Sequence, residues 1–144
     1  MTADELYEKG LSFLREKNTL SALASFEKAY ALKKTPANMS FLGFCISQER
    51  GQIKEAISLC ENAILQEPDN SLLYLNLGRV LLKAGRRSEA LDTLRKGLSY
   101  GDNIEIRKML EELGSRRKVL FPFLDRKCIL NKISGFILKH LGIK

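Results

Sequence analysis

The chain has 144 residues, of which 44% are hydrophobic and 28% are charged, and its formal net charge is +7. This length suits one compact domain, and the composition excludes an intrinsically disordered chain. No run approaches the roughly 20 apolar residues of a transmembrane helix, and the acidic start lacks the pattern of a secretion signal. Three cysteines at unrelated spacings predict a reducing compartment without a disulfide framework, so we expect a cytoplasmic protein.

The positive charge is concentrated at the C-terminal end. Residues 1–114 hold 16 basic and 16 acidic side chains, whereas residues 115–144 hold eight basic side chains and one acid, Asp125. The sequence therefore divides into a neutral part and a basic segment, which we define as residues 115–144.

Helical patterns follow one another along the neutral part. Apolar residues recur there at helical spacing, and Gly51 and Gly85 mark turns between helices. The predicted helices lie near residues 3–16, 20–33, 36–49, 53–66, 71–84, 87–100 and 103–113.

Three helix starts carry recognisable capping signals. Thr2 with Glu5 has the pattern of a capping box, and so does Asp102 with Glu105. Thr35 before a proline predicts an N-cap followed by proline at the first helical position.

The predicted helices repeat with a period of 34 residues. The three repeats span residues 3–36, 37–70 and 71–104. Each has a glycine near its eighth position, Gly10, Gly43 or Gly78, which lets paired helices approach closely. Because Gly43 comes one residue early, we expect the first helix of the second repeat to be shifted or lengthened. A fixed period of this length predicts a solenoid, in which each repeat buries its apolar face by stacking on the next.

Over about residues 3–104 this pattern resembles the tetratricopeptide repeat. The third repeat fits best, with Tyr74, Leu77, Gly78, Leu81, Ala90 and Leu94. The first matches at Leu6, Gly10, Phe13, Ala22, Phe26 and Ala29, and the second at Ala56, Cys60, Ala63 and Pro68. The resemblance implies an all-α fold, a right-handed α-solenoid of three helix-turn-helix repeats. The expected domains are an array over residues 1–114, with a capping helix over 103–113, and the basic segment with a C-terminal amphipathic helix.

The resemblance also implies a concave groove along the first helices of the repeats, which binds a peptide or helix of another protein. Carried onto this chain, the groove residues are Tyr7, Leu11, Leu14, Arg15, Phe44, Gln48, Leu72, Leu75, Arg79, Leu82 and Lys83. In the shifted second repeat the alternatives are Ser40 or Phe41, Phe44 or Cys45, and Ser47, Gln48 or Glu49. These residues predict an apolar groove with a basic patch from Arg79 and Lys83.

One specialised activity of the family is not implied. Members that clamp the terminal carboxylate of chaperones use Lys and Asn at two groove positions, which Tyr7 and Leu11 occupy here. The groove is nearer to one that takes an apolar helix. Alternatively, some of its leucines pack against the chain's own basic segment.

The basic segment contains a predicted amphipathic helix over residues 128–141. Its apolar face consists of Ile129, Leu130, Ile133, Phe136, Ile137 and Leu141. Two interpretations stay open: this face docks on protein, either in the chain's own groove or on a second copy to give a dimer, or it lies on an anionic membrane surface. Nucleic-acid binding is disfavoured, because aromatic residues interleaved with the basic ones are lacking.

Signatures of catalysis are absent from the sequence. It holds one histidine, His140, and no Gly-rich phosphate loop, nucleophile motif or metal-spaced cluster. We therefore predict a non-catalytic protein-interaction module or adaptor that needs no cofactor. The alternative is an adaptor held peripherally at a membrane by the amphipathic helix.

Overall fold

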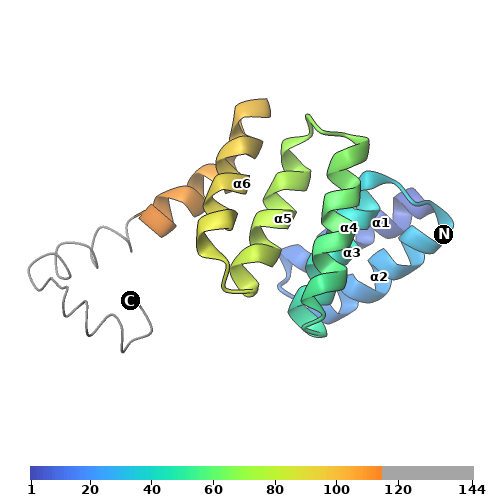
Figure 1. Ribbon diagram of the computed structural model, residues 1–144. Helices are drawn as coiled ribbons and strands as arrows, with labels where there is room; N and C mark the ends of the chain where they lie inside the picture. Colours follow the sequence, from blue (N-terminus) through green and yellow to red (C-terminus); the bar gives the residue numbers. More distant parts are fainter. Residues whose placement is uncertain (115–144) are drawn as a thin grey trace, which may run out of the picture. The chain divides into compact units, whose positions relative to one another are not determined.

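A computed structural model of the chain describes residues 1–114, and this part consists of helices and turns with no strand (Figure 1). The helices are α1 (Ala3–Arg15), α2 (Thr19–Leu32), α3 (Pro36–Glu49), α4 (Ile53–Gln66), α5 (Ser71–Lys83) and α6 (Arg87–Tyr100). A further helical segment covers residues 104–114. The predicted all-α fold is therefore confirmed.

Two compact units divide the chain, one over residues 1–106 and the other over residues 107–144. The amphipathic helix predicted over 128–141, with its apolar face from Ile129 to Leu141, lies outside the described residues. Within residues 1–114, none of the helices is both long and apolar enough to span a membrane.

Three helical hairpins build the first unit. Figure 1 shows α1 with α2, α3 with α4 and α5 with α6 as neighbouring pairs. Each hairpin also packs on the next, because α2 contacts α3, and α5 contacts both α3 and α4. This is the stacking expected of a helical-repeat array.

The predicted start signals act at α1 and α3. Thr2 Oγ1 accepts a hydrogen bond from the Glu5 amide at 3.1 Å, and the Thr2 amide donates to Glu5 Oε1 at 2.8 Å. Thr35 caps α3 by accepting from the Asn38 amide at 3.1 Å. These bonds satisfy amide groups that a helix leaves without a partner at its first turn.

The capping box predicted at Asp102 and Glu105 is wrong. Asn103 Oδ1 accepts a hydrogen bond from the Ile106 amide at 3.0 Å, so Asn103 is the residue that caps the helical segment 104–114. The Glu105 carboxylate is consequently available for a different contact, described below.

The repeat period is kept by the second helix of each hairpin. These helices begin at Thr19, Ile53 and Arg87, a constant spacing of 34 residues. The first helix of the second hairpin instead begins at Pro36, one residue ahead of the period, and it has 14 residues where α1 and α5 have 13. The expected shift of this helix is confirmed, and the Thr35 cap with proline at the first helical position accounts for it.

The core runs between the hairpins. Its buried cluster consists of Ala22, Leu23, Phe26, Phe41, Leu42, Cys45, Ile46, Ala56, Cys60, Leu77, Val80, Leu81 and Ala90. The rings of Phe26 from α2 and Phe41 from α3 stack with their centroids 5.1 Å apart, which joins the first hairpin to the second.

Candidate functional site

A groove of about 370 Å³ runs along the first helices of the three hairpins. Its walls are formed by Tyr7, Leu11, Leu14, Arg15, Phe41, Leu72, Arg79 and Glu105. Helices α1, α3 and α5 and the segment 104–114 each contribute at least one of these side chains. The lining is mostly apolar, with two cations and one carboxylate.

An aromatic cluster anchors the apolar part of the groove. The Tyr7 ring meets Phe26 edge-on at 5.9 Å and Phe41 edge-on at 5.7 Å, measured between ring centroids. Burial raises the pKa of the Tyr7 hydroxyl above 10.0, and the nearby Glu8 carboxylate adds to this shift. Tyr7 therefore presents a neutral ring whose orientation is set by helices α2 and α3.

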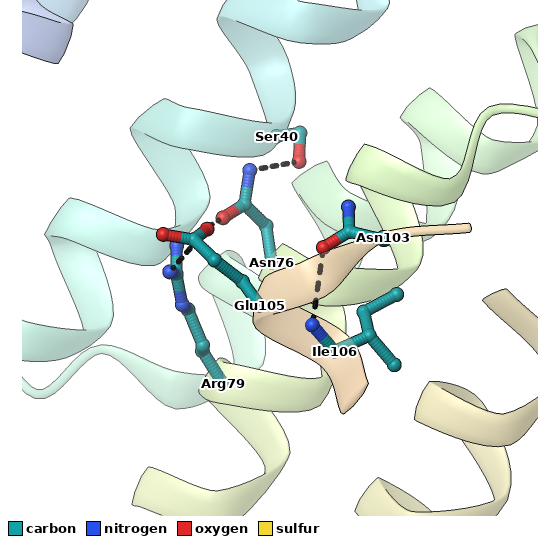
Figure 2. A network of polar contacts seen from close by, with 6 residues as sticks. All are labelled: Ser40, Asn76, Arg79, Asn103, Glu105 and Ile106. Atoms are coloured by element: carbon teal, nitrogen blue, oxygen red, sulfur yellow. Dashed lines mark hydrogen bonds and ion pairs between the residues drawn. The ribbon is translucent and has the colours of Figure 1, made fainter. Parts of the chain in front are cut away.

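Arg79 is one of the two arginines that line the groove, and Figure 2 shows it beside Asn76 and Glu105. Its Nη1 donates to Asn76 Oδ1 at 3.2 Å, and its Nη2 donates to Glu105 Oε1 at 3.2 Å. The guanidinium carbon lies 5.1 Å from the centroid of the Phe44 ring, a cation–π arrangement. Burial lowers the pKa of Arg79, an effect that Glu105 opposes, and a guanidinium stays protonated at neutral pH in any case.

A buried polar contact holds Asn76 in place beneath Arg79. Asn76 Nδ2 donates to Ser40 Oγ at 2.8 Å, and both residues are completely buried (Figure 2). Because Asn76 belongs to α5 and Ser40 to α3, this bond links the second and third hairpins. The position of the Arg79 guanidinium is thus set by the packing of two helices.

The structure brings six of the predicted groove residues together on the groove surface. They are Tyr7, Leu11, Leu14, Arg15, Leu72 and Arg79. Phe44 lies against the Arg79 guanidinium. Half-buried Gln48, half-buried Leu82 and exposed Lys83 do not line the groove, so the predicted basic patch of Arg79 and Lys83 is replaced by Arg15 and Arg79.

Leu75 requires a correction, because its side chain has 0% exposure and cannot contact a ligand in this structure. The reason is that α5 packs against α3, α4 and α6, so that eight of its 13 residues are buried. Few positions on such an enclosed helix can face a groove.

Two groove residues were not in the predicted set. Phe41 was one of two alternatives for the shifted helix α3, and the one-residue shift made the choice ambiguous. The sequence pattern predicts a capping box at Glu105, and no local pattern indicates that its carboxylate contacts Arg79, 26 residues earlier in the chain.

The described part of the chain offers no sign of a metal centre. Within residues 1–114, no group of three or more His, Cys, Asp or Glu side chains is placed to hold a metal ion. The groove offers a ligand an apolar surface and two guanidinium groups.

Comparisons with known proteins agree with this architecture. A family model described as the tetratricopeptide repeat matches residues 48–113. No curated protein sequence matches the chain at a significant level.

Solved structures share the fold. The first TPR domain of Spaghetti (RPAP3), bound to the HSP90 peptide SRMEEVD, superposes with a TM-score of 0.63 at 17% identity, covering 81% of this chain and 96% of that one. The Sgt2 TPR domain from Aspergillus fumigatus gives a TM-score of 0.63 at 21% identity, with 81% and 78% covered. The TPR2AB domain of yeast Sti1, in a complex with pHSP90, gives 0.61 at 20% identity, with 82% and 48% covered. The family match identifies tetratricopeptide repeats over residues 48–113, and the solved structures show that the array as a whole has the same fold.

Proposed function

We propose that this chain is a protein-interaction module that binds a peptide or short helix of another protein in the groove along α1, α3 and α5. The observation that carries the proposal is the open groove itself, in which Tyr7, Leu11 and Leu72 remain partly exposed where three repeats meet. The complex of the Spaghetti (RPAP3) domain with an HSP90 peptide supports the use of this fold for peptide binding, and the complex of the yeast Sti1 domain with pHSP90 supports its use for protein interaction.

The groove lining favours a partner with apolar side chains. A leucine-sized side chain that leaves water for such a surface contributes about 1.5–3 kcal/mol. The stacked rings beneath Tyr7 hold this surface in one shape before a ligand arrives, which lowers the entropic cost of binding. Helix-in-groove or extended-peptide recognition is the mode that this arrangement supports.

The proposal does not include clamping of a chaperone's terminal carboxylate. Tyr7 and Leu11 stand where that subset of the family has Lys and Asn, and both side chains here extend the apolar wall. The proposal involves no catalysis. Membrane anchoring would depend on the basic segment. No observation on residues 1–114 supports it.

A selection experiment tests the proposal. A random peptide library displayed on phage is panned against the full chain, and recovered peptides are measured by fluorescence polarisation. Leu72→Glu places a carboxylate on the apolar wall and should weaken binding at least tenfold, about 1.4 kcal/mol. Leu65→Glu is the matched control, because Leu65 lies on α4 outside the groove and is 78% exposed. If the peptides bind the Leu72→Glu variant as tightly as they bind the natural protein, the binding surface lies outside the groove.

A further inference from the structure

We propose that the partner segment carries a carboxylate that takes the place of Glu105 on Arg79, so that Glu105 is an internal competitor for the ligand. This inference rests on the groove function proposed above and specifies the partner as an apolar, acidic segment of another protein. The structural basis is that one carboxylate of this chain already sits on the groove's most constrained cation.

The cation remains in position without Glu105. Arg79 is held by Asn76 Oδ1 and lies against the Phe44 ring, and Asn76 is in turn fixed by buried Ser40. The Arg79 side chain is only 25% exposed, and it lines the groove. A carboxylate arriving through the groove would therefore meet a guanidinium that is already oriented.

Glu105, in contrast, is readily displaced. Its side chain is 64% exposed, and Arg79 Nη2 is the partner that the structure gives its carboxylate. Only Arg79 of this pair is partly buried, and water solvates the released Glu105 carboxylate, so Glu105 is lost at little cost when another carboxylate replaces it on Arg79. Rotation of the Glu105 side chain can free Arg79 while the helices stay in place.

Exchange of one carboxylate for another explains why an acidic ligand is favoured. A neutral ligand that displaced Glu105 would leave the partly buried Arg79 without a counter-charge, which is unfavourable. A ligand with a carboxylate preserves the pair, and Arg15 in the same groove adds a second attraction.

Charge complementarity also favours an acidic partner over the chain's own basic segment as the occupant of the groove. That segment has eight basic residues and a single acid, Asp125. A groove with two arginines and one glutamate repels such a sequence more than it attracts it. The occupant that fits the groove is an acidic segment from another protein.

The test compares the peptide affinities of the Glu105→Gln variant and of the natural protein. Two sets of peptides are used: those recovered in the phage selection, and amide copies of them in which every Asp is replaced by Asn and every Glu by Gln. Glu55→Gln is the matched control, since Glu55 is an exposed glutamate on α4 outside the groove. Glu105→Gln should strengthen the binding of acidic peptides about two- to fivefold, because the competing carboxylate is solvent-exposed and weakly held, and it should leave the affinity of the amide copies unchanged. Thermal melts by circular dichroism check that each variant folds.

The outcomes distinguish this inference from the groove function. Recovered peptides without acidic residues, or an equal effect of Glu105→Gln on acidic peptides and amide copies, would overturn the inference alone. If no recovered peptide is sensitive to Leu72→Glu, the groove function fails and the inference fails with it. A synthetic peptide of residues 115–144 should not compete with the acidic peptides. Competition would make the chain's own segment the occupant and overturn the inference.

Discussion

The backbone of Gly10 lies so close to the Phe26 ring that a Cβ atom at position 10 would stand 2.6 Å from Phe26 Cζ. Two more atoms of the same ring would lie within 2.8 Å, so the whole ring edge would have to move. The ring cannot retreat freely, because it stacks on Phe41 at 5.1 Å and meets Tyr7 edge-on. This close approach of α1 and α2 thus lies beside the aromatic cluster that shapes the groove.

Gly10→Ala should therefore destabilise the protein, although alanine favours a helix by about 1 kcal/mol over glycine. We expect a net loss of about 1–3 kcal/mol in the free energy of unfolding, the usual cost of overpacking. Urea unfolding followed by circular dichroism measures it. Gly114→Ala is the control, because a Cβ atom there meets nothing within 4 Å. An unchanged or higher stability for Gly10→Ala would mean that α1 and α2 lie farther apart than described.

The buried Asn76–Ser40 bond should show energetic coupling. Asn76→Ala removes the partner of Ser40 and also a partner of Arg79, so we expect a loss of about 1–3 kcal/mol. Ser40→Ala alone should cost less, because Asn76 keeps its contact with Arg79. A double-mutant cycle should give a coupling of about 0.5–1.5 kcal/mol. Strictly additive single effects would show that the bond contributes nothing to joining the second and third hairpins.

The same substitution should destabilise the protein far more at Leu75 than at Leu72. Leu75→Glu buries a carboxylate in a fully enclosed site and should cost several kcal/mol, enough to unfold much of the chain. Leu72→Glu, on the partly exposed wall of the groove, should change the free energy of unfolding by less than about 1 kcal/mol. Denaturant titrations of both variants give the comparison. Equal stability of the two would contradict the placement of Leu75.

The buried thiols should make stability depend on alkaline pH. Burial raises the pKa of Cys45 and of Cys60 from 9.0 to about 12. The unfolded chain therefore releases these protons near pH 9 while the folded chain keeps them. The stabilising contribution is complete below that pH and is lost as pH rises toward 12, by up to about 1.4 kcal/mol per pH unit for each thiol.

Urea titrations at about pH 8 and about pH 10 test this dependence. The natural sequence should lose more stability between these conditions than a variant with Cys45→Ala and Cys60→Ala, in which only other groups titrate. A variant that lost just as much would show that both thiols ionise normally in the folded protein.

Local patterns in the sequence were sufficient for the helices and their pairing. The cap at Thr35, the turn glycines and the 34-residue period each depend on neighbouring residues, and the early start of α3 followed from one displaced glycine. The φ angles of Gly51 and Gly85, 65° and 81°, lie in the left-handed region that glycine favours.

Fewer of the groove residues could be predicted, because the exposure of each side chain depends on how the helices pack against one another. Leu75 has the pattern of a groove residue, but the neighbours of α5 bury it. Glu105 was missed for a related reason, since its contact with Arg79 joins two segments that only the folded array brings together. Choosing Asn103 over Asp102 as the cap required the backbone geometry at that turn.

The buried position of Ile106 means that the protein's folding boundary does not coincide with its repeat boundary. Ile106 has 0% exposure, and its Cδ1 would lie 3.1 Å from a Cβ atom at Gly97 in the last repeat. A chain cut after Ile104, where the third repeat ends, would expose apolar surface that Ile106 now covers. A shortened or engineered array should therefore keep the third repeat together with the residues up to Ile106.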